Sequence, residues 1–174
     1  CGLRNGEIMG LEWKDFDFNN NIFEVKRASQ YISNEGIITK MPKNQTSIRK
    51  IHFNDSLKEL LMEHKINNKE LAETIPNWIE TDRVFTTNKG GAIFPDTISK
   101  WFAKFLKRNN FSNKITFHGL RHTSATIMIY NEIDIQTIAT RLGHADPTTT
   151  LKIYSHQIKK ADKTAADKIF DTLK

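Results

Sequence analysis

The spacing of apolar residues changes along this chain, and that change limits the fold more than any other feature of the sequence. Polar and apolar residues alternate at 15–18 and 48–53, and an apolar-rich segment lies at 22–25, so three short β-strands are predicted. From Asp96 onward, apolar residues recur at the spacing of an α-helix instead. The sequence therefore predicts an α+β fold, mostly helical, with a small antiparallel three-stranded sheet.

Capping residues mark where the predicted helices begin and end. Asn54 or Asp55 is expected to start a helix that runs to about Thr74. The polar segment 33–47, between the second and third strands, is expected to be a long loop or hairpin tip. The further helices are predicted from Asp96, over 118–130, from Asp134 to Gly143, and from Asp146 onward. The side chains predicted to face inward include Leu57, Leu60, Leu61 and His64, with Trp13, Trp78 and Trp101 at least partly in the core.

Length and composition restrict the class of protein. A chain of 174 residues with 38% hydrophobic residues is long enough for one domain with a hydrophobic core. No stretch reaches the roughly 18 apolar residues of a membrane span and no signal peptide is visible, so we expect a cytoplasmic protein. The single cysteine, Cys1, excludes an internal disulfide framework and a zinc site built from several cysteines.

The net positive charge comes from one part of the chain. Residues 1–95 carry 13 basic and 13 acidic side chains, whereas residues 96–174 carry 13 basic and 7 acidic ones, which accounts for the net charge of +6. A stripe of one sign suits a polyanion such as nucleic acid, although a solvated lysine-rich face explains it equally well. The candidates for contacts with a DNA backbone are Lys100, Lys104, Lys107, Arg108 and Lys114.

The segment His118-Gly-Leu-Arg121 carries the strongest chemical signal. Residues three apart share one face of a helix, so the His118 imidazole and the Arg121 guanidinium can reach one ligand together. An arginine fork fits two phosphate oxygens, and a neighbouring imidazole can share or transfer a proton. Two arginines, two histidines and a tyrosine suit a metal-free attack on a phosphodiester. The other members of this set are Arg4 with Glu7 one turn after it, His144 and Tyr154.

These motifs, in this order, resemble those of the tyrosine recombinases, specifically the integrases of phages and integrative conjugative elements. The resemblance spans the chain, from its first residues to its last thirty. The blocks that carry it are Gly2-Leu3-Arg4-Asn5-Gly6-Glu7-Ile8 with Leu11-Glu12-Trp13, Thr39-Lys40-Met41-Pro42-Lys43 with Ser47-Ile48-Arg49, Phe117-His118-Gly119-Leu120-Arg121-His122-Thr123, Leu142-Gly143-His144, and Ile153-Tyr154-Ser155-His156.

The resemblance implies a role for each candidate residue. Arg4 and Arg121 match the two arginines that grip the scissile phosphate, and Glu7 matches an acidic position that supports the first arginine. His118 matches a histidine that is both base and phosphate ligand, and His144 matches a second histidine that hydrogen-bonds the phosphate.

Two more residues complete the implied reaction. Lys43 matches the general acid toward the leaving 5′-oxygen, although Lys40 lies in the same loop. Tyr154 matches the nucleophile, which forms a 3′-phosphotyrosyl bond that stores the energy of the phosphodiester. Rejoining then needs no ATP, metal or other cofactor.

The resemblance also implies the organisation of the whole protein. Residues 1–174 are expected to form a single catalytic domain, without the core-binding and arm-binding domains that precede it in the family. Because the chain begins with Cys-Gly-Leu-Arg rather than Met, we expect it to be part of a longer protein. The expected partner is double-stranded DNA at attachment sites. The full-length protein is expected to act as a homotetramer, and this chain alone can be monomeric.

Alternative readings remain open at this point. Within the family, an enzyme of the Xer type that resolves chromosome dimers competes with an integrase that inserts or excises a mobile element. Outside it, the segment from Asp134 to Thr150 resembles a helix-turn-helix, so a DNA-binding module without catalysis is possible. His122 has the spacing to His118 of a helix-borne zinc pair, but Arg121 between them would repel a cation. We therefore expect His122 to be buried and hydrogen-bonded.

Overall fold

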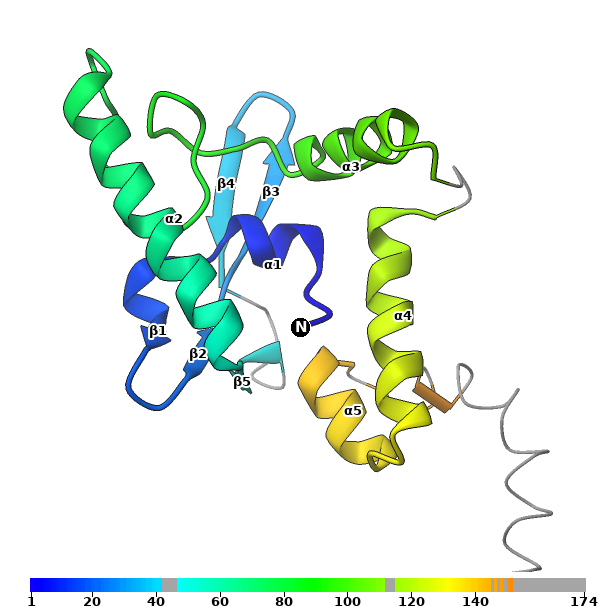
Figure 1. Ribbon diagram of the computed structural model, residues 1–174. Helices are drawn as coiled ribbons and strands as arrows, with labels where there is room; N and C mark the ends of the chain where they lie inside the picture. The colour runs from blue at the N-terminus through cyan, green and yellow to red at the C-terminus, as the bar shows by residue number, and fades with distance from the viewer. Residues whose placement is uncertain (42–46, 112–114, 145, 147, 149, 152–174) are drawn as a thin grey trace, which may run out of the picture.

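The computed structural model describes the whole chain except residues 42–46, 112–114, 145, 147, 149 and 152–174 (Figure 1). None of the helices in the described part is long and apolar enough to cross a membrane. The elements follow one another as α1 (Asn5–Met9), the 3-10 helix η1 (Trp13–Asp15), β1 (Phe16–Asp17), β2 (Ile22–Val25), β3 (Ala28–Ile32), β4 (Gly36–Lys40), β5 (Arg49–His52), α2 (Asp55–Thr74), α3 (Thr97–Arg108), α4 (Phe117–Tyr130) and α5 (Ile135–Leu142).

The predicted three-stranded antiparallel sheet is confirmed. Its strands lie in the order β1-β2-β5, and Phe23 of β2 pairs with Ile51 of β5. Side chains alternate along β5, where Arg49 and Ile51 are buried and Lys50 and His52 are exposed. The inward apolar side chains of this sheet pack with Leu11, which follows α1, with Leu61 of α2 and with Val84 of the segment after α2 to form one core.

The loop predicted over 33–47 is wrong for residues 36–40, which form β4. This strand pairs with β3 in a second, two-stranded antiparallel sheet, in which Ser29 lies opposite Thr39. Four of the five residues of β4 are only partly buried, so this strand lacks the clear alternation of buried and exposed residues that marks β5. The turn between β3 and β4 uses positive φ angles at Asn34 (72°) and Gly36 (80°).

Helix α2 has the predicted bounds, and Asn54 is its N-cap, because its side chain accepts a hydrogen bond from the Leu57 amide. The predicted inward face is wrong at Leu60, which is 62% exposed, whereas Leu61 is 8% exposed. The buried stripe runs through Leu57, Leu61 and His64, at the i, i+4, i+7 spacing of one helix face, and Leu60 lies beside it.

Helices α3, α4 and α5 confirm the helices predicted from Asp96, over 118–130 and from Asp134 to Gly143. In Figure 1, α4 and α5 lie together on one side of α1, and α2 lies on the other side, next to the three-stranded sheet. Ala125 and Ile129 of α4 pack against Ile138 and Leu142 of α5 in a second, smaller core. Helix α3 buries Leu106, but Trp101 is 57% exposed, so its predicted place in the core is wrong.

Candidate active site

Arg4 lies immediately before α1 and is held there by Glu7. The Glu7 carboxylate accepts from the Arg4 main-chain amide (2.8 Å) and from its Nη1 (2.9 Å), so Glu7 satisfies the free amide at the start of the helix. Nη2 of Arg4 donates to the carbonyl of Gly143 (2.8 Å). The side chain remains 43% exposed, so this guanidinium is anchored on one edge and open on the other.

Arg121 is buried in the first half of α4 and meets the same end of α5. Its Nη1 donates to the carbonyl of Gly2 and its Nη2 to the carbonyl of Leu142, both at 2.6 Å. Burial, and next the charge of Arg4, lower the pKa of Arg121 to about 10, so it remains a cation at neutral pH. Gly2 has a φ of +71°, and a Cβ there would lie 2.5 Å from Leu142, so glycine permits this close approach.

The two arginines therefore converge on consecutive carbonyls, of Leu142 and Gly143, at the C-terminal end of α5. The last carbonyls of a helix have no partner within it and carry partial negative charge. Gly143 ends the helix in the left-handed conformation, as the sequence predicts. Arg4 is paired with the Glu7 carboxylate as well, whereas Arg121 donates to main-chain carbonyls. Carbonyl acceptors therefore hold the two guanidinium groups at one helix end without adding a second negative charge.

His144 follows Gly143 directly, so the same helix end positions it. Its Nδ1 lies 2.8 Å from the hydroxyl of Thr150, a residue that is fully buried. Burial, and next the charges of Arg121 and Arg4, lower the pKa of His144 to about 4. His144 is therefore neutral at physiological pH.

His118 and His122 lie one turn apart on α4, with ring centroids 5.2 Å from each other. Burial, then His122, Arg121 and Arg4, lower the pKa of His118, which favours the neutral form able to accept a proton. The prediction that His122 is buried is wrong, because it is exposed on α4. The helix begins just before His118, where the Thr116 side chain caps it.

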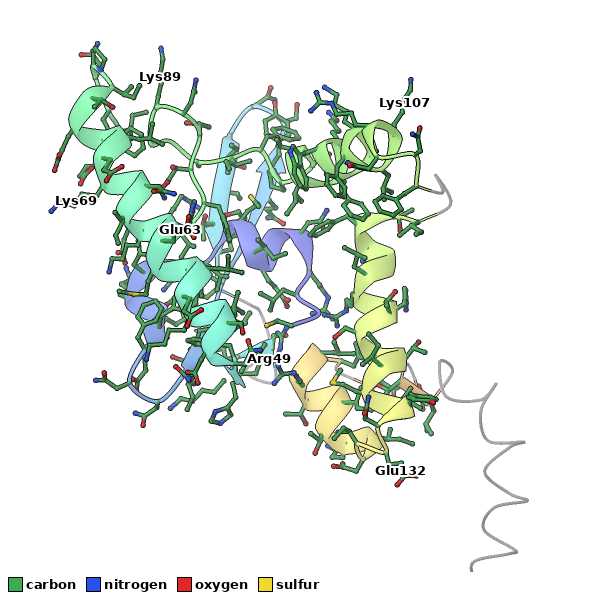
Figure 2. All side chains as sticks on the ribbon, viewed as in Figure 1. Arg49, Glu63, Lys69, Lys89, Lys107 and Glu132 are labelled. Carbon is green, nitrogen blue, oxygen red and sulfur yellow. The ribbon has the colours of Figure 1, made fainter. Side chains whose placement is uncertain are left out.

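The structure does not describe some of the predicted residues, and it places others on α3. The predicted general acid Lys43, the predicted nucleophile Tyr154 and the backbone candidate Lys114 lie outside the described residues. Figure 2 shows Lys107 projecting outward from α3, and the other candidates on this helix are also exposed. These are Lys100, Lys104 and Arg108.

One residue of the cluster had no assigned role in the sequence prediction. Arg49, on the buried face of β5, donates Nη1 and Nη2 to the two carboxylate oxygens of Glu7 at 3.0 and 2.9 Å. A signal for it was present, because the alternation of β5 places Arg49 on the same face as Ile51 and Phe53. An arginine on an apolar face needs an acidic partner, which identifies it as part of a buried charge network.

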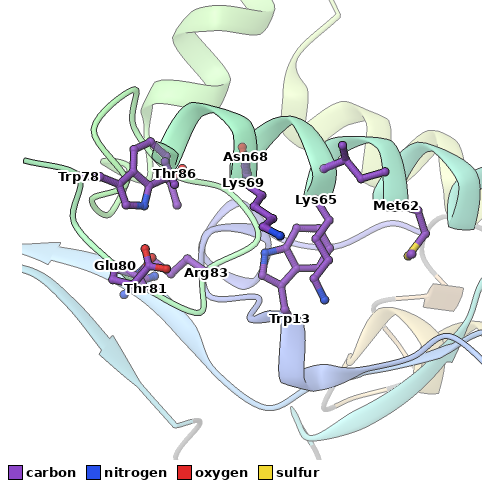
Figure 3. Close-up of a pocket in the computed structure, with 12 residues that line it drawn as sticks. Trp13, Met62, Lys65, Asn68, Lys69, Trp78, Glu80, Thr81, Arg83 and Thr86 are labelled. Carbon is purple, nitrogen blue, oxygen red and sulfur yellow. The ribbon is translucent and has the colours of Figure 1, made fainter. Parts of the chain in front are cut away.

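A cavity of about 380 Å³ lies elsewhere, between α2 and the residues that follow it (Figure 3). Trp13, Lys65 and Trp78 contribute to its walls. Of the predicted site residues that the structure describes, none lines this cavity. The convergent charged groups at the end of α5 are therefore the better candidate for an active site.

A family match and individual relatives of the chain both point to one protein family. Residues 1–161 match the phage integrase family. The chain is 31% identical to a XerC-like tyrosine recombinase of Caldanaerobacter subterraneus and 30% identical to the ICEBs1 integrase of Bacillus subtilis. These alignments cover 98% and 99% of the chain but 46% of each relative, so the chain spans about half the length of the relatives it matches.

The fold has a counterpart among solved structures. The Tn1549 transposon integrase, solved in complex with transposon right end DNA, superposes with a TM-score of 0.77 at 26% identity. The match covers 88% of this chain and 50% of that one. The shared fold and the family match over nearly the whole chain agree with the motif order, and on these grounds the chain belongs to the phage integrase family of tyrosine recombinases.

Proposed function

We propose that this chain is the catalytic domain of an integrase that cleaves and rejoins double-stranded DNA through a 3′-phosphotyrosyl intermediate. The observation that carries the proposal is the convergence of Arg4 and Arg121 on neighbouring carbonyls at the end of α5. His144 follows in the chain at the same helix end, and its pKa is lowered by the charges of both arginines in addition to burial. Two fixed cations beside a neutral imidazole suit a phosphodiester.

The arginines would act on the charge of the transition state. When a nucleophile attacks a phosphodiester, negative charge grows on the non-bridging oxygens, and preorganised donors stabilise it most. Each guanidinium carries five N–H groups, and the contacts of Arg4 with Glu7 and Gly143 leave several of its own for a ligand. Arg121 contributes a charge that its burial leaves little screened by water.

The remaining roles come from the family motifs. The Tyr154 oxygen would attack the phosphorus and lose its proton to a base, for which His118 is the candidate, while the bond to the 5′-oxygen breaks. Lys43 would give that oxygen a proton. The phosphotyrosyl bond keeps the energy of the phosphodiester, so the reverse attack by a 5′-hydroxyl restores the DNA strand.

The proposal extends to the whole protein, its location in the cell and its assembly. We expect the whole protein to carry further DNA-binding domains, to act in the cytoplasm and to assemble as a homotetramer on two duplexes, while this chain alone can be monomeric. Both an ICE integrase and a XerC-like recombinase are among its relatives, so resolution of chromosome dimers is the second candidate. The long polar stretch 31–47 resembles that of integrases, whereas Xer proteins are shorter there, and this favours the integrase.

A helix-turn-helix without catalysis fits less well. The end of α5 accepts hydrogen bonds from Arg4 and Arg121, and it is held by residues from the opposite end of the chain. A recognition helix requires no such pair of arginines at its C-terminal end. This arrangement supports an enzyme site at the end of α5.

The test is covalent trapping on a nicked suicide duplex that carries a candidate attachment site. We expect the full-length protein to form a protein–DNA adduct that resists denaturation, and Tyr154→Phe to abolish it. Tyr130→Phe is the matched control, because Tyr130 is 79% exposed on α4 and has no proposed role. An adduct that persists in Tyr154→Phe, or DNA binding without any adduct, would overturn the proposal. Loss of cleavage on addition of chelator would point to a metal-dependent nuclease.

A further inference from the structure

Arg49 is a buried cation of the cluster at the end of α5. Its side chain is 3% exposed and forms a two-pronged contact with Glu7, Nη1 to Oε1 at 3.0 Å and Nη2 to Oε2 at 2.9 Å. In Figure 2, Arg49 lies where β5 approaches α5. Hydrogen bonds to Glu7, to the Ser47 carbonyl and to the Arg141 carbonyl use four of its five N–H groups. Any effect of Arg49 on a reaction is therefore expected to pass through its neighbours.

Glu7 transmits the position of Arg49 to Arg4. The same two carboxylate oxygens that accept from Arg49 also accept from Arg4, Oε1 from Nη1 and Oε2 from the main-chain amide. Burial raises the pKa of Glu7, but the hydrogen bonds from Arg49 and Arg4 outweigh it and hold the pKa below its usual value. Glu7 is thus an ionised bridge between a buried arginine and a partly exposed one.

Arg49 also fixes the helix end that precedes His144. Its Nε donates to the carbonyl of Arg141 at 2.8 Å. Gly143 lies directly against the guanidinium, and a Cβ on Gly143 would be 2.6 Å from Nη1 of Arg49. Since the Gly143 carbonyl accepts from Arg4, Gly143 lies between the two arginines.

The charge of Arg49 adds to the positive charge of the empty site. Glu7 is paired with Arg4 and Arg49, whereas Arg121 is held by main-chain carbonyls. The charges of Arg4 and Arg49 both act against the charged form of Arg121, and the charge of Glu7 favours it. Such an excess of positive charge disfavours the empty site. A bound phosphodiester, and still more its transition state, relieves that repulsion.

We propose that Arg49 is a positioning residue, which orients Arg4 through Glu7 and the segment before His144 through Gly143, so that the phosphate-binding groups are arranged before DNA arrives. The inference rests on the proposed function. Its competitor is a purely structural ion pair, which would stabilise the fold without any specific effect on the chemical step.

Arg27 and Asp15 provide a matched control pair. Arg27 is 14% exposed and contacts the buried carboxylate of Asp15 at 2.8 Å, in a cluster that contains none of the predicted site residues. The variants Arg27→Lys and Arg27→Met therefore report what the loss of a buried arginine–carboxylate pair does to the fold alone.

The experiment measures single-turnover cleavage of the suicide duplex by the full-length protein, at saturating DNA, together with DNA affinity and unfolding temperature. We expect Arg49→Lys to slow cleavage about 10- to 100-fold, with DNA affinity changed less than about threefold, because lysine keeps the charge but not the two-pronged geometry. Arg27→Lys, at a comparable loss of unfolding temperature, should leave the cleavage rate near that of the wild type.

A double-mutant cycle then tests the route through Glu7. If Arg49 acts on Arg4 through this carboxylate, Arg49→Met should slow cleavage far less in a Glu7→Gln background than in the wild type. Cleavage by Arg49→Met should also fall at acidic pH where Glu7 becomes protonated, and the double variant should lack that dependence.

The outcomes separate the two proposals. A wild-type protein that binds DNA but forms no adduct overturns the proposed function, and the role of Arg49 falls with it. A wild-type adduct with additive effects of Arg49→Met and Glu7→Gln, or with Arg49→Lys no slower than Arg27→Lys, overturns only the positioning role.

Discussion

Nδ1 of His144 and the hydroxyl of Thr150 are hydrogen-bonded at 2.8 Å, and Thr150 is fully buried. The contact fixes the orientation of the imidazole ring. When the Thr150 hydroxyl donates to Nδ1, the proton of the neutral ring is on Nε2, where it can donate to a phosphate oxygen. With the Thr150 hydroxyl as donor, the Nε2–H group is the one that His144 offers to a ligand.

Thr150→Val should therefore slow strand cleavage while leaving the fold largely intact, because valine has the shape of threonine without its hydroxyl. One lost hydrogen bond corresponds to about a tenfold slower rate. Single-turnover cleavage measures it, with Thr148→Val as the control, since Thr148 is exposed and its hydroxyl contacts Asp146. Equal rates in the two variants would show that the Thr150 hydroxyl has no part in orienting His144.

Gly143→Ala should destabilise the protein more than Gly36→Ala, although both glycines have a positive φ, of 68° and 80°. The left-handed backbone alone costs a residue with a Cβ about 1–2 kcal/mol. A Cβ at Gly36 meets nothing within 4 Å, whereas one at Gly143 would lie 2.6 Å from Arg49. Urea unfolding of both variants isolates this clash. Similar losses of unfolding free energy would mean that Arg49 moves aside without cost.

The helices could be predicted from the sequence because their signals are local. Asn54 and Asp134 cap α2 and α5 through contacts three residues away, and Gly143 ends α5 by its own backbone conformation. The strand β4 could not be predicted in this way, because four of its five residues are partly buried and burial does not alternate along it. Trp101 follows a helical apolar spacing but remains exposed, since periodicity identifies a face and not what covers it.

The candidate site likewise has a part that the sequence predicts and a part that it does not. The motif order identified Arg4, Glu7 and Arg121 as members of one site, and the structure brings them together. The pairing of Arg49 with Glu7 joins residues 42 positions apart, and that contact exists only once β5 lies beside α1. Which buried arginine meets which carboxylate is decided by the fold, so sequence spacing alone does not predict it.

Leu61→Ala should cost about 2–4 kcal/mol of unfolding free energy, because Leu61 is 8% exposed and part of the main core. The neighbouring Leu60→Ala should stay within about 0.5 kcal/mol, because Leu60 is 62% exposed. Urea denaturation of this adjacent pair tests the orientation of α2. The reverse order would mean that the helix is rotated about its axis.

Lys104→Gln combined with Lys107→Gln should weaken DNA binding and reduce its dependence on salt. Each contact with a phosphate contributes about 0.9 to the slope of log K against log salt concentration, so two lost contacts lower its magnitude by about 1.8. Lys69→Gln is the control, because Lys69 projects from α2 on the other side of the molecule (Figure 2). Fluorescence anisotropy over a salt series measures the slopes, and an unchanged slope would remove these lysines from the DNA interface.

Acid should weaken the fold in two ranges of pH. The pKa of His144 is about 4 in the folded protein, against an ordinary value of 6.5. Between these two pH values His144 is protonated in the unfolded chain but neutral in the folded one. The stability that this provides is complete above about pH 6.5 and is lost as the pH falls toward 4. The pKa of Glu7 is lowered as well, so its contribution is complete above its ordinary value of 4.5 and is lost below it.

Unfolding free energies from urea titrations at pH 7.5, 6.0, 5.0 and 4.0 should therefore decline steadily in the wild type. His144→Gln removes the group that titrates between 6.5 and 4, so its decline over that range should be shallower, although the lowered pKa of His118 preserves part of it. His52→Gln serves as the control, because His52 is an exposed residue of β5. A decline in His144→Gln as steep as that of the wild type would show that the end of α5 does not exclude the proton from His144.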